Sequence, residues 1–298
     1  MLAEDCTFSN SLPNGTGRVS PMAGVDLEPN RPTDRLHNIT FRRCKALNNS
    51  GAGFQAFPVS IDPPLSPLPP AAPLHPLGDA AAELERWARR GALNASSLPV
   101  KIRFEDCHVE GVGFKPYGTV VSCGYYFNSF GGKGAPGWIT VDGGTVKRTV
   151  SFGAAVYAHG ANDPHVTFSG VTFDHVAITP GAFDPKLNFS NGPLTIAALG
   201  NKLGGHDLGG VTFKDVVVKD DRDRPVLVVV GDEGDGVADV GGSITVHNPH
   251  HTAGCSVVVG AEGWTEGQAA AATKALTANV SVDCQSRRVL QSAAAEGY

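Results

Sequence analysis

The chain has 298 residues, of which 18% are charged, and its formal net charge is -5 at pH 7. This weakly acidic balance provides no broad basic surface that would attract phosphates, so it argues against a nucleic-acid-binding protein. No apolar run reaches the roughly 18 residues that a membrane-spanning helix needs, so we also expect no membrane partner.

A short alternating pattern recurs along the chain. It is clearest at Ile39–Cys44 and Ile102–Cys107, where apolar and polar residues alternate and a cysteine follows three residues after a phenylalanine. Alternation with a period of two is typical of a β-strand that buries one face. Related copies begin at Ile139, Val166, Val211, Ile244 and Val280.

The starting points of the seven copies are separated by 63, 37, 27, 45, 33 and 36 residues, which mostly falls in the range of solenoid repeats. Each unit has room for two or three short strands, with Gly, Asn and Asp where turns are needed. One unit cannot bury its apolar face alone, whereas stacked units share a core and a long parallel sheet. We therefore predict one all-β domain over residues 1–290 and a tail at 291–298.

The first predicted unit begins at the N-terminus, where Ala3–Cys6 aligns with Phe41–Cys44. Met1 then falls where a strand is already under way, so we interpret the chain as lacking its N-terminal coils. The alternative is a true start with an irregular first coil.

Residues 58–98 interrupt the second unit and are predicted to form an insertion. Proline is dense at 63–70, and a proline-rich stretch cannot form a strand ladder. Asp79 then provides an N-cap for a helix from Ala80 to about Arg90. Insertions in solenoids often lie beside the binding face.

Candidate functional residues come from the strand that follows a glycine in the early units. With each glycine as a register mark, the outward side chains form columns in which successive coils lie about 4.8 Å apart. Asn30 and His159 lie one outward step beyond these columns. The first predicted column contains Asp26, Gln55, Lys115 and Ala155, and the second contains Glu28, Phe57, Tyr117 and Tyr157.

Two further features concern the interior and the C-terminal end. Cys6, Cys44 and Cys107 share one repeat position, so we expect a stack of small buried thiols, with a disulfide as the alternative where geometry suits it. The alanine-rich run from Gln268 to Ala275 favours a short helix that caps the open end of the sheet.

N-x-S/T sequons are frequent and favour a secreted or cell-wall glycoprotein. They occur at Asn14, Asn38, Asn48, Asn94, Asn188 and Asn279.

Three segments, Gly24–Asn30, Leu36–Cys44 and Asn48–Phe54, resemble right-handed parallel β-helix repeat proteins of the pectate-lyase-like superfamily. The resemblance is clear over residues 1–57 and 100–125 and looser to residue 285. It implies a right-handed parallel β-helix that carries the Pro-rich and helical insertion. It implies no single activity, because the superfamily includes polysaccharide lyases, glycoside hydrolases, epimerases and proteins without known catalysis.

The known catalytic patterns of the superfamily are only partly present. The polygalacturonate hydrolases carry an Asn-Thr-Asp strand, an Asp-Asp pair and a Gly-His-Gly turn, of which Asp220-Asp221 and Gly205–Asp207 are faint counterparts. Pectate lyases carry an Arg-x-Pro-x-x-Arg element, whereas Arg222–Val226 has no second arginine at the required place. Neither chemistry is therefore transferred to this chain.

One hypothesis is a polysaccharide lyase or C5-epimerase-like enzyme that acts on an acidic glycan. A cation or a lysine would neutralise the uronate carboxylate, and a tyrosine or histidine would exchange the C5 proton. Asp26 and Glu28 would be charged groups or Ca²⁺ ligands, and Asn30 and Gln55 would complete the substrate-binding set. Lys115 would neutralise the substrate, and the proton carriers would come from Tyr117, Tyr157 and His159.

The second hypothesis is a non-catalytic cell-wall or matrix protein that binds glycans along the same sheet through tyrosines and polar side chains. Whether the protein is an enzyme stays open at this stage. A purely structural role is a further alternative for the carboxylates, because Asp26 and Glu28 could simply be solvated outward groups.

Overall fold

The structure is a computed structural model in which nearly all regular elements are β-strands. The predicted Pro-rich and helical part of the insertion at 61–98 and the predicted tail at 291–298 lie outside the described residues. The structure describes residues 1–12, 22–29, 36–60, 99–113, 122–128, 133–134, 137–158, 164–178, 192–198, 210–222, 224–230, 240–248, 256–260 and 265–285.

A 13-stranded sheet contains two sets of strands that alternate along the chain. The first set is β1 (Leu2–Glu4), β4 (Ile39–Arg42), β8 (Val100–Glu105), β12 (Gly137–Asp142) and β15 (His165–Ser169). The second set is β2 (Thr7–Ser9), β5 (Lys45–Leu47), β9 (His108–Glu110), β13 (Thr145–Lys147) and β16 (Thr172–Asp174). The longer strands β18 (Val211–Lys219) and β20 (Val240–His247) pair along both sets, and β22 (Val280–Gln285) ends the sheet.

A seven-stranded sheet receives one strand from each successive unit. A short antiparallel pair joins β7 (Val59–Ser60) to β11 (Lys133–Gly134). The strands of the seven-stranded sheet are β3 (Val25–Leu27), β6 (Phe54–Ala56), β10 (Cys123–Asn128), β14 (Phe152–Ala158), β17 (Leu194–Ala198), β19 (Leu227–Val230) and β21 (Val257–Gly260).

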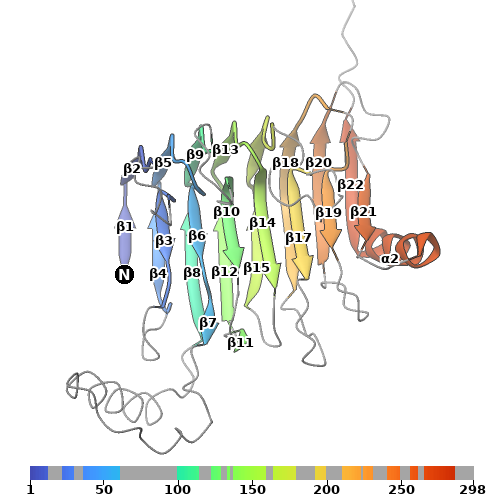
Figure 1. Ribbon diagram of the computed structural model, residues 1–298, viewed down its shortest axis with the longest axis horizontal. Helices are drawn as coiled ribbons and strands as arrows, with labels where there is room; N and C mark the ends of the chain where they lie inside the picture. The colour runs from blue at the N-terminus through green and yellow to red at the C-terminus, as the bar shows by residue number, and fades with distance from the viewer. Residues whose placement is uncertain are drawn as a thin grey trace, which may run out of the picture.

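Both large sheets are parallel, and each strand lies beside its counterpart in the next unit along the chain. Figure 1 shows this order running from β1 at one end of the molecule to β22 and the helix α2 (Glu266–Asn279) at the other. Parallel strands that follow one another in this way are compatible with a β-helix-like solenoid. The all-β prediction and its long parallel sheets are confirmed.

Five of the seven predicted triplets stack as expected. Ile39, Ile102, Ile139, Val166 and Val211 are paired in succession from β4 to β18. The prediction is wrong at Ile244, which pairs with Val216, while Val240 continues the column from Val211. The reason is a register shift between Phe213 and Val216, which lets one long strand contribute to both strand sets.

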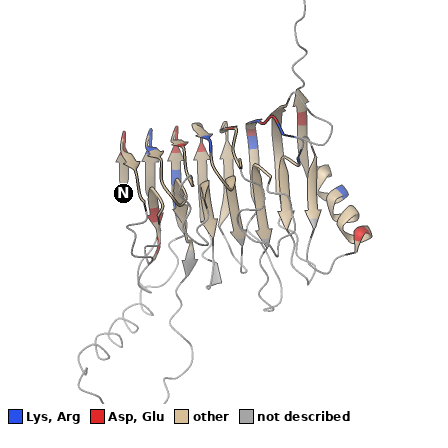
Figure 2. Cartoon of the chain, turned by 45° about the horizontal axis from the view of Figure 1, so that its top comes forward, with Lys and Arg blue, Asp and Glu red and all other residues tan. Residues whose placement is uncertain are grey.

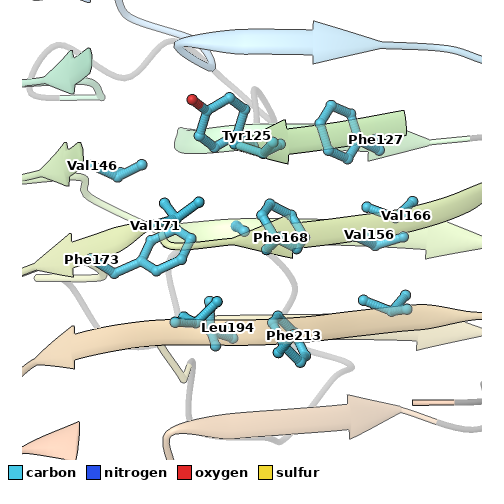
Figure 3. Close-up of a cluster of buried hydrophobic side chains, with 14 of the residues drawn as sticks. Tyr125, Phe127, Val146, Val156, Val166, Phe168, Val171, Phe173, Leu194 and Phe213 are labelled. Atoms are coloured by element: carbon cyan, nitrogen blue, oxygen red, sulfur yellow. The ribbon is translucent and has the colours of Figure 1, made fainter. Parts of the chain in front are cut away.

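The interior is a continuous stack of aromatic and aliphatic side chains between the two sheets. Phe104 is fully buried, and its ring stacks on those of Phe41 and Phe127 with centroids 5.4 and 5.9 Å apart. Figure 3 shows how the stack continues past Tyr125 to Phe168 and Phe213. Burying each such side chain contributes about 1.5–3 kcal/mol, so the stack is the main source of stability.

A glycine lies immediately before, or as the second residue of, each of the first four strands of the seven-stranded sheet, because the two sheets approach closely there. A Cβ atom on Gly53 would lie 2.5 Å from a methyl group of Val109, and one on Gly124 would lie 2.4 Å from a methyl group of Val146. Any larger residue would therefore push the sheets apart.

The predicted thiol stack is confirmed. Cys6, Cys44 and Cys107 are all free, and the last two are fully buried. The Cys44 thiol donates to the carbonyl oxygen of Ala3 at 3.5 Å, and Cys107 donates to that of Phe41 at the same distance. Burial raises the pKa of the Cys107 thiol to about 12, so it stays protonated and unreactive at neutral pH.

The C-terminal helix prediction is also confirmed, and α2 extends beyond the alanine-rich run at both ends. A capping box between Thr265 and Gln268 begins the helix. Leu276 is buried in the core, and the Thr273 hydroxyl accepts a hydrogen bond from the Val259 amide of β21. These contacts hold α2 against the last strands. Within the described residues no helix is both long and apolar enough to cross a membrane.

Candidate functional site

The first predicted column lies on the outward face of the seven-stranded sheet, with one correction. Asp26 of β3 is opposite Gln55 of β6, as predicted, but Gln55 is opposite Tyr126 of β10, where Lys115 was expected. Tyr126 is followed by Ala155 and then by Thr195.

The register differs because two glycines in this unit have similar surroundings. Gly113 was used as the mark, yet it has a φ of +86° and belongs to a turn, while Gly124 is the residue that begins the strand contacts. Gly124–Phe127 therefore takes the place that the sequence argument gave to Gly113–Pro116.

The second column is corrected in the same way. Asn128 occupies the position expected for Tyr117, and it is opposite Tyr157, which lies where it was predicted. Asn30, Lys115, Tyr117 and His159 lie outside the described residues, so their positions relative to this face stay predictions.

A hydrogen-bonded carboxyl lies at the N-terminal end of this face. Gln55 Nε2 donates to Asp26 Oδ1 at 2.7 Å. Burial raises the pKa of Asp26, and the Gln55 hydrogen bond offsets only part of that effect. Burial and the neighbouring charge of Asp26 also raise the pKa of Glu28. A carboxyl with a raised pKa can donate as well as accept a hydrogen bond.

Aromatic side chains continue the face. The ring of Tyr126 meets Phe57 on one side and Tyr157 on the other, edge to face, with centroids 5.8 and 5.4 Å apart. Asn128 Nδ2 donates a hydrogen bond to the hydroxyl oxygen of Tyr126. Burial raises the pKa of Tyr126, so its hydroxyl keeps its proton at neutral pH and is not a general base.

The face is more enclosed than an open groove, because most of its outward side chains are buried. Gln55, Tyr126, Asn128, Tyr157 and Thr195 are all between 3% and 7% exposed. Tyr126 and Tyr157 belong to a second cluster of buried hydrophobic residues outside the main core. Asp26 and Phe57 are half-buried, and Glu28 is exposed.

Two polar atoms on this enclosed face have no hydrogen-bond partner. They are Asn128 Oδ1 and Thr195 Oγ1, whose side chains are each 6% exposed. A buried polar atom without a partner costs about 1–3 kcal/mol, so such atoms are rare in folded proteins and mark positions that suit a bound polar group. Sequence reasoning missed both residues, although Asn128 follows the same glycine-aromatic pattern that located Gln55.

The predicted Ca²⁺ site has few ligands in the described part of the chain. No group of three or more His, Cys, Asp or Glu side chains converges among these residues. A calcium ion usually takes six to eight oxygen ligands, so the Ca²⁺ hypothesis depends on Asp26 and Glu28 being joined by other oxygens.

The turns of the 13-stranded sheet carry most of the charged side chains, which gather along one edge in Figure 2. Arg43 contacts both Glu4 and Asp5 at 2.8 Å, and Arg42 contacts Glu105 at 2.5 Å. These pairs are exposed to solvent, which screens them, so each stabilises the fold only weakly. The neighbouring carboxylates largely neutralise the charges of Arg42 and Arg43.

The Arg222–Val226 segment, which was compared with the lyase element, has a structural role for Arg224. Its Nε donates to Asp220 Oδ2 at 2.7 Å, and its terminal nitrogens donate to the carbonyl oxygens of Ala177 and Val176 at 2.6 and 2.7 Å. Arg224 and Asp220 are both buried. This buried pair connects one turn to its neighbour and does not face the candidate site residues described above.

Comparison with known proteins found no matching family model, and no significant match among curated proteins or solved structures. The class that the fold defines is therefore an all-β protein with long parallel sheets, compatible with a β-helix-like solenoid.

Proposed function

We propose that this chain is a right-handed parallel β-helix protein, similar to the pectate-lyase-like superfamily, and that the outward face of its seven-stranded sheet binds a glycan. The observation that carries the proposal is the pair of unpartnered buried polar atoms on Asn128 and Thr195, on the face that also presents Asp26 and Gln55.

The chemistry of this face suits sugar rings. Hydroxyl groups of a sugar both donate and accept hydrogen bonds, and the free acceptor of Asn128, the hydroxyl of Thr195 and the carboxyl of Asp26 supply both roles. The aromatic rings of Tyr126 and Tyr157 add flat apolar surface beside these polar groups. The combination is typical of binding sites, which are largely apolar with a few well-placed polar groups.

A catalytic form of the proposal is favoured by the raised pKa values of Asp26 and Glu28. Shifted carboxyl groups that lie together are typical of catalytic sites. The chain would then be a lyase or C5-epimerase-like enzyme on an acidic glycan. A base would remove the C5 proton, and in a lyase the C4–O bond would break as the C4–C5 double bond forms. Lys115, Tyr117, Tyr157 and His159 are the proposed groups for this chemistry.

Secretion is part of the proposal and has two supports. The sequons at Asn38 and Asn279 lie on exposed residues, where a glycan can be accommodated. Cys284 is disulfide-bonded, which suits an oxidising compartment.

The test uses the full chain on a glycan array and on a panel of uronate polymers. We expect wild-type protein to bind a glycan, and Asp26→Asn and Thr195→Val to weaken this binding about tenfold or more, because each removes a hydrogen-bonding group. Thr140→Ala on the 13-stranded sheet is the matched control and should bind normally. Unsaturated products from uronates would select the lyase, C5-inverted uronate residues would select the epimerase, and binding without turnover would select the glycan-binding protein. Normal binding by both site variants would contradict the proposal.

Asp26→Asn should also raise the melting temperature at pH 7, so weaker glycan binding by this variant could not be attributed to unfolding. Burial raises the pKa of Asp26 in the folded protein, so the folded state holds the Asp26 proton more tightly than the unfolded state does. The resulting stabilisation is complete below the unfolded pKa of about 3.8 and is lost as the pH rises through the pKa of the folded protein. The variant is therefore expected to melt at a higher temperature than wild type at pH 7 and to lose this advantage near pH 3.

Asp5→Asn is the matched comparison for that measurement. Arg43 lowers the pKa of Asp5, so the contribution of Asp5 is present above its unfolded pKa and is lost as the pH falls. Both substitutions replace the same carboxyl with an amide, yet thermal melts at pH 7 should move in opposite directions. A lower melting temperature for Asp26→Asn at pH 7 would contradict the burial of its carboxyl.

A further inference from the structure

A cavity of about 530 Å³ lies at the turns that connect the second strand set to the seven-stranded sheet, away from the outward face described above. It is within the size range of small-molecule sites. The turns of four successive coils form it, and the residues that line it are Asn10, Leu12, Leu47, Asn48, Asn49, Ser50, Glu110, Gly111 and Arg148.

The hollow has a simple origin in the sequence. Four residues, Asn10, Asn48, Gly111 and Arg148, occupy the same turn position in consecutive coils. All four have a left-handed backbone, with φ values of 59°, 55°, 70° and 53°. Each amide donates to a carbonyl of the next coil, as Asn48 does to Glu110 and Gly111 does to Lys147. Only Gly111 of the four lacks a side chain, which leaves room between Asn48 and Arg148. The Asn48 side chain extends into part of this room, because its Oδ1 lies 2.6 Å from the position of a Cβ atom on Gly111.

The floor of the cavity presents an unpartnered hydroxyl. Ser50 is fully buried, and its Oγ has no hydrogen-bond partner. The neighbouring Asn49 is fully engaged, because its Oδ1 accepts from the Ser11 amide and its Nδ2 donates to the carbonyl of Phe8. Asn49 thus holds the loop in place, and the Ser50 hydroxyl is buried beside the cavity without a partner.

The charges around the cavity balance. Glu110 brings one negative charge and Arg148 one positive charge to the lining, so neither an anion nor a cation is favoured overall. Glu110 accepts hydrogen bonds, Arg148 donates them, and the amide of Asn48 does both. Leu12 and Leu47 add apolar surface. Such a set matches a neutral ligand with several hydroxyl groups on an apolar ring.

We propose that this cavity binds a neutral hexopyranose unit, as a free sugar or as the end of a glycan. Its hydroxyl groups pair with Glu110, Arg148 and the side-chain amide of Asn48, and its carbon face packs on Leu12 and Leu47. The site is separate from the proposed glycan-binding face and does not depend on it.

Gly111→Asn is the variant that tests the proposal. Asparagine already occupies the same turn position at Asn10 and Asn48, so the left-handed backbone accepts it. The added Cβ meets only the flexible end of the Asn48 side chain, at 2.6 Å, which can move aside. The new side chain fills the hollow. Gly143→Asn is the matched control, because Gly143 has a φ of +69° and a similar contact with the Asp106 side chain, but lies at a different turn.

Binding is measured by saturation-transfer NMR titration of glucose, galactose and mannose, with glucuronate and glucosamine as charged comparisons. We expect a neutral hexose to bind wild type and Gly143→Asn equally, and Gly111→Asn at least tenfold more weakly. The proposal is overturned if no neutral hexose binds, if only a charged sugar binds, or if Gly111→Asn binds as well as wild type.

Discussion

Replacing Arg224 with methionine is expected to lower the free energy of unfolding by about 3–5 kcal/mol. The guanidinium is buried and bonded to the Asp220 carboxylate and to the backbone carbonyls of Val176 and Ala177. Without it, a buried carboxylate loses its counter-charge and two carbonyl oxygens lose a donor. The loss should appear in urea or guanidinium denaturation of the full chain.

Two further variants test whether the buried, unpaired carboxylate causes the loss of stability in Arg224→Met. The double variant Asp220→Asn with Arg224→Met removes the unpaired charge and should recover part of the stability. Arg43→Met breaks two exposed ion pairs, which solvent screens, so it should lower the free energy of unfolding much less than Arg224→Met. A loss of under about 1 kcal/mol for Arg224→Met would mean that the buried pair does not hold the two turns together.

Replacing Phe104 with alanine is expected to cost about 3–5 kcal/mol, because it leaves a cavity in the centre of the aromatic stack. The ring of Phe104 contacts four others, those of Phe41, Phe54, Tyr125 and Phe127, at centroid distances of 5.2 to 5.9 Å. The substitution therefore removes a ring contact from all four of these residues, which belong to the neighbouring coils. The effect should appear as a lower denaturation midpoint.

Phe104→Leu and Trp138→Ala provide the comparisons for this measurement. Leucine keeps most of the buried volume, so Phe104→Leu should cost less than Phe104→Ala. Trp138 lies on the same sheet but is 54% exposed, so its removal should change stability by about 0.5 kcal/mol. Equal losses for Phe104→Ala and Trp138→Ala would show that the interior stack does not dominate stability.

The strand pattern was predictable because it is local. In Ile39–Arg42 and Ile102–Glu105 the alternation of apolar and polar residues places each side chain inside or outside, and the burial of β8 follows it residue by residue. The cysteine stack followed from the same repeat. The prediction failed at β18, where the register shifts between Phe213 and Val216. The exposed residues Lys214 and Asp215 interrupt the alternation there, but only the pairing of β18 with β20 shows which later residue continues the column.

The candidate site was only partly predictable. Asp26, Gln55 and Tyr157 were placed on the correct face, because each follows a glycine that marks the close approach of the sheets. Tyr126 and Asn128 were missed, since Gly113 and Gly124 are each followed by an aromatic residue and either could begin the strand. Only the pairing of β10 with β6 distinguishes them.

The sequence by itself determined that this is an all-β chain of repeated units whose strands stack in parallel. It also determined which side chains face the interior. Both follow from local features, because period-two alternation and turn residues act within a few positions. The tertiary structure alone decided which glycine begins β10, that the outward face is enclosed, and that Arg224 bridges two turns. These depend on pairing and packing between residues far apart in the chain, and the spacing along the sequence does not encode them.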